Sequence, residues 1–409
     1  MITVDTAALS AALRALPDRP RVVVSGNHSV PWDLVRLLDE HVESYILNTL
    51  NGPPGLPDRP GVTAETCFVG AGQRRHSGLS YVPSRLSMVP VLFRTSLPPD
   101  AVFLHCSPPR DGMVSLGIEV NVMPAALEAC RERGGLVVAM VNDRMPYTYG
   151  DALVPVDHID MALETSTVLP APGAPTPLGE DALTIGRAVA EMVPDGATLQ
   201  MGIGAVPDAA LASLTGHTGL RLWTEMFSDG VLALDEVGAL DPDHPLTTSF
   251  LFGTQDLYDW LDGNRRVHLS RTERTNDPAL IARQRSMTSI NTALEVDLFG
   301  QANASRINSR IHSGFGGQTD FIVGALHSEG GQAIMALRSW HPKADVSTIV
   351  PMVDEPVTSF QASAIVTEQG VARLYGHSEK DQARALIENA AHPRVRDELW
   401  EEAHHLGLA

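Results

Sequence analysis

The sequence predicts an α/β fold with mostly parallel sheets, divided into two domains. Three observations predict it. Strand-like runs alternate with helix-like segments, a proline-rich stretch interrupts the alternation near the middle of the chain, and the alternation then resumes. Strands that are apolar along their whole length and separated by helices are typical of parallel sheets covered on both faces. A chain of 409 residues is also longer than one ordinary core supports.

The first half supplies the clearest strands. Residues 21–26 (RVVVSG), 101–109 (AVFLHCSPP) and 136–142 (LVVAMVN) are apolar runs that end in glycine, proline or asparagine. Between them, residues 32–42 (WDLVRLLDEHV) and 123–135 (MPAALEACRERGG) have apolar residues at helical spacing, and the second segment ends in glycine. The order strand, helix, strand predicts parallel strand pairs joined by crossover helices.

Residues 166–181 (STVLPAPGAPTPLGED) are rich in proline and glycine and predict a stiff linker. We therefore expect domains at residues 1–170 and 171–409. The second half reads as a helix (181–193), then strand, glycine loop and helix (197–214), then a strand (220–227). Further apolar runs predict strands at RVHLS, FIVGAL, AIMAL and SAIVTEQG, and DQARALIENAAHPRVRDELWEEAHHLG predicts a C-terminal helix interrupted by proline.

Composition excludes several classes of function. Lys and Arg number 30 against 49 Asp and Glu, a net charge of -19, which argues against nucleic acid or an anionic membrane as a partner. Any phosphate site must then be local, built from backbone N–H groups. The three cysteines lack CxxC spacing and the histidines lack metal-ligand spacing, so we expect no disulfide framework and no metal. With no apolar run of membrane-spanning length and no signal peptide, a cytoplasmic protein is expected.

Two glycine-rich segments are candidate ligand loops. In QMGIGAVPDAALASL (200–214), glycines stand where a strand becomes a helix, so backbone N–H groups can approach an anion at the helix N-terminus. In SGFGGQTDFIVGA (313–325), glycines precede an apolar run read as a strand and are candidates to donate to an oxyanion. An ordinary tight turn explains each segment equally well.

Three polar residues are ambiguous by themselves. Glu225 stands in LWTEMFSDGV between an apolar run and a Ser-Asp-Gly turn, where a solvated glutamate is the ordinary interpretation. Asn276 precedes Asp-Pro and reads as a turn residue or helix cap, and Asn291 reads the same way.

Taken together, several segments resemble one family. QMGIGAVPDA, TEMFSDGV, NDPALIARQ, SINTALEVDLFGQ, SGFGGQTDF and VTEQGVARL occur in the order seen in the acetyl-CoA hydrolase/transferase family, and SPPRDGMVSLG and VNDRMPYTYG extend the likeness into the first half. This group includes 4-hydroxybutyrate and succinyl-CoA:acetate CoA-transferases. The resemblance implies two open α/β/α domains of the CoA-transferase (NagB/RpiA-like) type, the active site between them, and a homodimer.

The resemblance also implies roles for residues. Glu225 matches the nucleophile, which takes the acyl group as an anhydride and then CoA as a glutamyl thioester. Gly317, with Gly316, is expected to stabilise the oxyanion, and Asn276 to hydrogen-bond the reacting carboxylates. The residues expected to bind CoA are Gly202, Ile203, Gly204, Ala205, Val206, Ser313, Gly316 and Gln318. Gln200 and Asn291 are expected to bind the substrate.

The function predicted in this way is transfer of CoA from an acyl-CoA to a small carboxylic acid, with coenzyme A as a substrate. An acyl-CoA hydrolase, acyl transfer to a dedicated biosynthetic acceptor and a non-catalytic acyl-CoA-binding protein are the alternatives. The chain departs from the family pattern near its C-terminus. Gln369 replaces a tyrosine, and Tyr375 and His377 stand where basic residues are usual, which points to altered CoA or acid binding.

Overall fold

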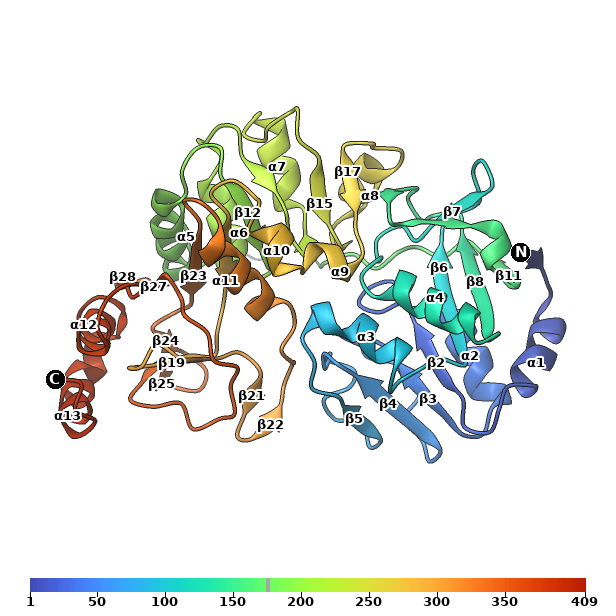
Figure 1. Ribbon diagram of the computed structural model, residues 1–409, viewed down its shortest axis with the longest axis horizontal. Coiled ribbons are helices and arrows are strands. Elements are labelled where there is room, and N and C mark those ends of the chain that lie inside the picture. Colours follow the sequence, from blue (N-terminus) through green and yellow to red (C-terminus); the bar gives the residue numbers. More distant parts are fainter. Residues whose placement is uncertain (174–176) are drawn as a thin grey trace. The chain divides into compact units, whose positions relative to one another are not determined.

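The structure, a computed structural model, describes residues 1–173 and 177–409, which form two compact units (Figure 1). Unit 1 comprises residues 1–173, 246–275 and 311–316, and unit 2 comprises the other described residues. Residues 174–176 of the proline-rich stretch lie outside the described residues. The division into domains 1–170 and 171–409 stays a prediction.

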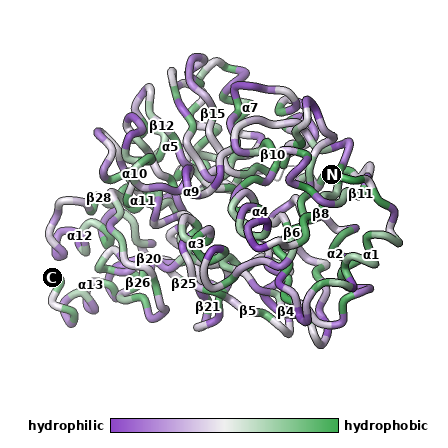
Figure 2. The backbone as a smooth tube through the Cα atoms, turned by 45° about the vertical axis from the view of Figure 1, so that its right-hand side comes forward, coloured by the Kyte–Doolittle hydropathy of each residue, from purple (hydrophilic) through white to green (hydrophobic). Residues whose placement is uncertain are grey.

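Unit 1 is built on a parallel sheet with the strand order β1-β11-β8-β6-β2-β3-β4-β5. Every residue of β6 (Ala101–Cys106) is buried, so the sheet is covered on both faces, and Figure 2 shows apolar stretches along β6 and β8. One face packs on α1 and α2 through Leu9, Leu13, Leu34 and Leu38. The strand order reverses between β2 (Arg21–Val24) and β6, because the chain first adds β3 to β5 on one side and later β6 on the other.

The remaining elements of unit 1 are the following. The main sheet and its helices include β1 (Ile2–Thr3), α1 (Thr6–Arg14), α2 (Trp32–His41), β3 (Tyr45–Asn48), β4 (Val62–Thr66), β5 (Leu79–Tyr81), α3 (Val89–Arg94), α4 (Met123–Glu132), β8 (Leu136–Asn142) and β11 (Met161–Thr165). Smaller sheets and further helices include β7 (Met113–Ser115), β9 (Tyr149–Gly150), β10 (Leu153–Pro155), β15 (Leu246–Thr248), β16 (Phe250–Leu251), α8 (Gln255–Leu261), β17 (Val267–Leu269) and α9 (Thr272–Thr275).

Unit 2 repeats this layering. Its main sheet has the order β13-β12-β18-β23-β27-β28 and is parallel except for the hairpin β27–β28. Helix α5 (Glu180–Met192) packs closely on α6 (Ala205–Ser213), since a Cβ at Gly186 would lie 2.5 Å from the Ala209 backbone. The strand order reverses between β12 (Thr198–Met201) and β18 (Thr288–Asn291).

The other elements of unit 2 complete this layer and a peripheral region. They include β13 (Arg221–Leu222), β14 (Met226–Phe227), α7 (Gly230–Glu236), α10 (Pro278–Ile281), β19 (Glu295–Asp297), β20 (Ala302–Asn303), β21 (Arg306–Ile307), α11 (Gln318–His327), β23 (Gln332–Ala336), β24 (Trp340–His341), β25 (Val346–Ser347), β26 (Ile349–Val350), β27 (Ala364–Thr367), β28 (Gly370–Arg373), α12 (Glu379–Ala385) and α13 (Arg396–His405). Strand β22 (Arg310–Ile311) lies where the chain passes from unit 2 to unit 1.

The predicted α/β class with mostly parallel sheets is confirmed, and the helix–strand order of the first half is confirmed with it. One strand assignment was wrong. The run FIVGAL was predicted as a strand, but it forms the middle of α11. This part of the helix is buried on most sides, as Phe321 and Ile322 show, so nearly all of its residues are apolar. A short apolar run of this kind has no clear period and fits a strand or a helix.

The predicted strand LRLWTEMF is also shorter than expected. Only Arg221–Leu222 and Met226–Phe227 are strands, and Glu225 lies in the bend between them. The three cysteines are free and buried. Within the part of the chain that the structure describes, no helix is long and apolar enough to cross a bilayer.

Candidate active site

The bend that carries Glu225 is held in place by the residue before it. The Thr224 hydroxyl is fully buried and lies 3.1 Å from the carbonyl oxygen of Met201 and 2.8 Å from that of Met226. It also accepts a hydrogen bond from the Met201 N–H at 3.4 Å. One side chain thus ties the bend to the carboxyl end of β12, and the half-buried Glu225 side chain starts from a fixed backbone.

Asn276 approaches Glu225 because its neighbour takes over the role of helix cap. Asp277 caps α10 by accepting a hydrogen bond from the Ala279 N–H at 2.8 Å. The Asn276 side chain, which is fully buried, instead donates from Nδ2 to Oε2 of Glu225 at 2.8 Å. The turn-or-cap interpretation therefore applies to Asp277, and the structure joins Asn276 to Glu225.

Gly317 completes this cluster by leaving room for it. A Cβ added at Gly317 would lie 1.9 Å from Oε2 of Glu225 and 2.2 Å from Nδ2 of Asn276. Its φ of -99° is open to any residue, so the space and not the backbone conformation requires glycine. The three residues predicted to be catalytic, which lie far apart in the sequence, therefore meet within unit 2.

Burial changes the proton affinity of Glu225. Desolvation is the main cause that raises its pKa to about 7, the donor Asn276 lowers it, and the negative charge of Asp320 raises it. A carboxyl group with a pKa near 7 is half ionised at neutral pH, and as a carboxylate it is a stronger nucleophile than an ordinary glutamate because it is less solvated.

This pKa predicts a pH dependence. If Glu225 reacts as the carboxylate, kcat/KM rises with pH through about 7 and levels off above it. Asn276→Ala removes a donor to the charged form, so the pKa of Glu225 rises further and the midpoint of the profile moves to higher pH by about one unit. The pH profile of kcat/KM for an acyl-CoA measures the midpoint. Asn389→Ala, which changes an exposed asparagine, is the matched control. An unmoved midpoint in Asn276→Ala would show that another group titrates.

The predicted CoA loop stands at the switch point of the unit 2 sheet. Gly204 has φ +118° and is the N-cap of α6, where no side chain caps the helix. Added Cβ atoms at Gly202 and Gly204 would meet nothing within 4 Å, and Ile203 is 47% exposed. Ligands of open α/β sheets bind at the carboxyl ends of the strands where the strand order reverses, here between β12 and β18. With Ala205 and Val206 in the first turn of α6, the loop offers N–H groups that have no partner within the helix at that point.

The residues predicted to bind substrate lie beside this loop. Gln200 is in β12 and is 5% exposed, and Asn291 is the last residue of β18. Asn291 donates from Nδ2 to Oε1 of Gln200 at 3.2 Å. Asn291 is therefore a strand residue and not part of a turn.

The other predicted CoA-binding residues divide between the units. In unit 1 the Ser313 carbonyl accepts a hydrogen bond from the Val69 N–H at 2.8 Å, and Gly316, with φ +56°, accepts one from the Leu86 N–H at 2.9 Å. In unit 2 Gln318 begins α11 and donates from Nε2 to the Thr292 carbonyl at 3.1 Å. Their contact with CoA stays a prediction.

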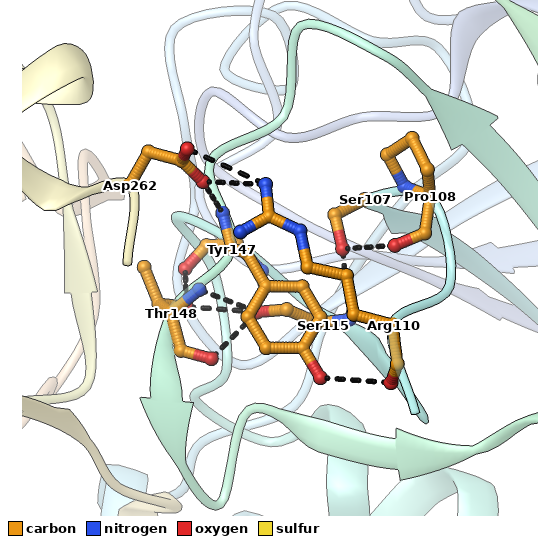
Figure 3. Close-up of polar contacts among 8 residues, drawn as sticks. Ser107, Pro108, Arg110, Ser115, Tyr147, Thr148 and Asp262 are labelled. Atoms are coloured by element: carbon orange, nitrogen blue, oxygen red, sulfur yellow. Dashed lines mark hydrogen bonds and ion pairs between the residues drawn. The ribbon is translucent and has the colours of Figure 1, made fainter. Parts of the chain in front are cut away.

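Unit 1 brings together two motifs that carried the resemblance, SPPRDGMVSLG and VNDRMPYTYG (Figure 3). The Ser115 Oγ and the Thr148 Oγ1 lie 2.9 Å apart. Arg110 stacks on the Tyr147 ring at 4.8 Å, and its guanidinium donates to both carboxylate oxygens of Asp262 at 3.1 and 3.3 Å. These contacts fix the loop after β6, where the strand order of unit 1 reverses.

The segment that departs from the family pattern forms the hairpin β27–β28. Gln369 stands in its turn, where its N–H donates to the Thr367 hydroxyl at 3.1 Å and its Nε2 to the Glu368 carboxylate at 3.1 Å. Tyr375, which follows the hairpin, is 59% exposed. The effect of these residues on CoA binding stays a prediction.

Sequence reasoning overlooked Thr224, Ser289 and Asp320. Thr224 is in the motif TEMFSDGV, directly before Glu225, and Asp320 is in the motif SGFGGQTDF, three residues after Gly317. Ser289 donates to Oε1 of Gln200 at 2.6 Å, and its place two residues before Asn291 in a strand puts both side chains on one face. That spacing was the available signal for Ser289.

Comparison with known proteins agrees with the arrangement of these motifs. The family model described as acetyl-CoA hydrolase/transferase N-terminal domain matches residues 59–170, and the one described as acetyl-CoA hydrolase/transferase C-terminal domain matches residues 253–403. The 4-hydroxybutyrate coenzyme A transferase of Clostridium kluyveri is 36% identical over 96% of this chain and 95% of its own length. An acetyl-CoA hydrolase of Kluyveromyces lactis is 33% identical over 68% of this chain and 57% of its own length.

Solved structures give the same result. RipA from Yersinia pestis superimposes with a TM-score of 0.88 and 26% identity, covering 99% of this chain and all of that one. The 4-hydroxybutyrate CoA-transferase of Porphyromonas gingivalis gives a TM-score of 0.82 and 29% identity, covering 99% of this chain and 98% of that one. The fold is therefore that of the CoA-transferases, and the homologues are enzymes. This chain belongs to the acetyl-CoA hydrolase/transferase family.

Proposed function

We propose that this enzyme transfers CoA from an acyl-CoA to a small carboxylic acid through a covalent glutamyl-CoA thioester on Glu225. The observation that carries the proposal is the cluster of Glu225, Asn276 and Gly317 in unit 2, with a carboxyl group whose pKa is about 7. The relatives named CoA-transferases support the reaction class.

The first half of the reaction forms the thioester. A carboxylate oxygen of Glu225 attacks the carbonyl carbon of the acyl-CoA, the C–S bond breaks, and CoA leaves as the thiolate. The thiolate sulfur then attacks the Glu225 carbonyl carbon of the resulting anhydride, and the free carboxylic acid leaves as its carboxylate. Each attack splits a difficult exchange into easier covalent steps.

The second half reverses these steps with the acceptor. Its carboxylate attacks the glutamyl thioester, CoA thiolate leaves, and a new anhydride forms. The thiolate attacks the acceptor's carbonyl carbon, which yields the new acyl-CoA and regenerates the Glu225 carboxylate. No oxidant or metal enters the balance.

The surroundings of Glu225 suit these steps. Helix α11 begins beside Glu225 without a side-chain cap, so its first-turn N–H groups and that of Gly317 are candidates to stabilise the tetrahedral oxyanions. Asn276 holds the attacking carboxylate in one orientation. The loop Gly202–Val206 is the candidate CoA site, and its backbone N–H groups fit an anionic cofactor in an acidic protein. Ser313, Gly316 and Gln318 as further CoA contacts, the homodimer and the cytoplasmic location remain predictions.

A hydrolase is the second candidate, because an acetyl-CoA hydrolase is among the relatives. Water would then attack the glutamyl thioester in place of the acceptor carboxylate, so that the C–S bond breaks, CoA is released and the Glu225 carboxylate is regenerated. Acyl transfer to a dedicated biosynthetic acceptor remains the third. The relatives are enzymes, which argues against the alternative of a non-catalytic acyl-CoA-binding protein.

The proposal is tested by steady-state kinetics with an acyl-CoA panel and acetate, with product acyl-CoA and free CoA measured separately. A transferase yields acetyl-CoA in proportion to the acyl-CoA consumed, and its double-reciprocal plots are parallel, as for a covalent ping-pong reaction. Release of free CoA at the same rate with and without acetate would identify a hydrolase. Intersecting plots would contradict the covalent intermediate.

A further inference from the structure

A row of polar side chains lies at the carboxyl ends of β12 and β18. Gln200 and Ser289 are partners in the register of these strands, and Asn291 follows two residues later, so all three side chains are on one face of the sheet. Gln200 is 5% exposed and Ser289 is fully buried. Asn291 is half-buried, and polar side chains this far removed from water need hydrogen-bond partners.

The hydrogen bonds of the row fix the orientation of the Gln200 amide. Ser289 donates from Oγ to Oε1 of Gln200 at 2.6 Å, and Asn291 donates from Nδ2 to the same oxygen at 3.2 Å and to Oγ of Ser289 at 2.8 Å. Two donors therefore hold the oxygen of Gln200, and its Nε2 points away from them. Among residues 1–173 and 177–409, no group accepts a hydrogen bond from that nitrogen, which is not among the fully buried atoms and so carries part of the 5% exposure of the side chain. An amide whose oxygen is held by two donors and whose nitrogen remains accessible presents its N–H groups in a fixed direction to a ligand oxygen.

Two series of contacts connect this row with Glu225 inside unit 2. Met201 follows Gln200, and its backbone is bonded to Thr224, the residue before Glu225. On the face of the row, Met335 is the register partner of Asn291, and its Sδ accepts a hydrogen bond from Nε2 of Gln318 at 3.8 Å. The residue before Gln318 is Gly317, which packs against the Glu225 carboxylate. The polar row is thus linked, by two short series of contacts, to residues that adjoin the proposed nucleophile.

We propose that Nε2 of Gln200 donates a hydrogen bond to an oxygen of the substrate's acyl part, and that Ser289 and Asn291 are positioning residues that hold the amide in this orientation. The inference rests on the proposed function, since it takes the ligand to be an acyl-CoA. The oxygen belongs either to the reacting carbonyl or to a hydroxyl group further along the acyl chain. Both are acceptors, and the experiment separates them.

The first arm compares two acyl-CoAs of equal chain length, butyryl-CoA and 4-hydroxybutyryl-CoA, with wild type and Gln200→Met. Methionine keeps the shape of glutamine without its donor. If the donor holds the chain hydroxyl, kcat/KM falls about 10-fold for 4-hydroxybutyryl-CoA alone. If it holds the carbonyl oxygen, kcat/KM falls about 100-fold for both, mainly through kcat. Unchanged values for both substrates would overturn the proposal.

A second variant tests whether the loss comes from the missing N–H groups and not from disturbance of the polar row. Gln200→Glu retains an oxygen that accepts from Ser289 and Asn291 but lacks the N–H groups, and it should share the loss seen in Gln200→Met. Gln255→Met, on the exposed side of α8, is the matched control and should match wild type.

The positioning role is tested by a double-mutant cycle. Ser289→Ala leaves the amide free to turn and should lower kcat/KM by several-fold, with the same preference between the two substrates as Gln200→Met. In the Gln200→Met background the same change should have almost no further effect. Additive losses would show that Ser289 acts only on the fold.

Affinity separates this inference from the proposed function. Dissociation constants of both acyl-CoAs are measured by calorimetry with Glu225→Ala and with Glu225→Ala/Gln200→Met, where no turnover occurs. A larger dissociation constant in the variant without Gln200 supports the proposed hydrogen bond. If wild type then shows no transfer, only the proposed function fails. If loss of Gln200 changes neither the dissociation constants nor kcat/KM, the proposed hydrogen bond from Gln200 is overturned, and the proposed function is unaffected.

Discussion

Replacing Glu225 by glutamine is expected to lower kcat/KM for CoA transfer by at least about 10³-fold, because the amide keeps the shape of the side chain but cannot attack a thioester. Wild type incubated with a reactive acyl-CoA and then with borohydride should show a mass change at Glu225, where the thioester is reduced to the alcohol. The change should be absent from Glu225→Gln. Intact-protein and peptide mass spectrometry measure it.

Stability gives this variant a second, independent readout. Desolvation raises the pKa of Glu225 from 4.5 to about 7, so the folded state binds the proton more tightly than the unfolded state. The resulting contribution to stability is present below pH 4.5 and is lost as pH rises towards 7. At pH 8 the wild type carries a half-buried, desolvated carboxylate, and Glu225→Gln should be more stable by up to about 3 kcal/mol.

The control for this prediction is Glu236→Gln, which changes an exposed glutamate of α7 and should alter neither activity nor stability. Transfer activity close to wild type in Glu225→Gln would remove Glu225 as the nucleophile. A loss of activity together with a lower melting temperature at pH 8 would show that the substitution disturbs the fold.

Substituting Gly317 by alanine is expected to lower kcat/KM by at least about 100-fold with little loss of stability. The new Cβ would lie 1.9 Å from Oε2 of Glu225 and 2.2 Å from Nδ2 of Asn276, so both groups must move. They are ends of side chains and the φ of Gly317 suits alanine, so the fold absorbs the change. The displaced Glu225 carboxylate, however, loses its reactive position, and a displacement of about 1 Å at a reacting group costs about 10²-fold in rate.

Kinetics and thermal unfolding of Gly317→Ala measure the two effects separately. Gly216→Ala is the matched control, because Gly216 is exposed and a Cβ there meets nothing within 4 Å. The yield of the borohydride-reduced adduct should fall in parallel with the rate. Activity within threefold of wild type would mean that the reactive position of the carboxylate is not the one beside Gly317.

Much of the fold follows from local pattern. The first-half strands and helices follow from apolar runs and helical spacing, because burial on both faces of a parallel sheet leaves a signal in each segment separately. The same local rule failed at FIVGAL. A short run that is buried on all sides fits a strand or a helix, and the packing of α11 decided between them.

The alternation of apolar runs and helical segments was enough for the sequence to predict the α/β class, and the order of its motifs was enough to predict the family and a candidate nucleophile, Glu225. Only the tertiary structure decided which groups surround that carboxyl. Asn276 is 51 residues from Glu225, and whether it or Asp277 caps α10 depends on what lies opposite each side chain. The need for glycine at 317 and the orientation of the Gln200 amide also depend on atoms from other segments. Distances of this kind arise from packing between residues remote in the chain, and no local pattern records them.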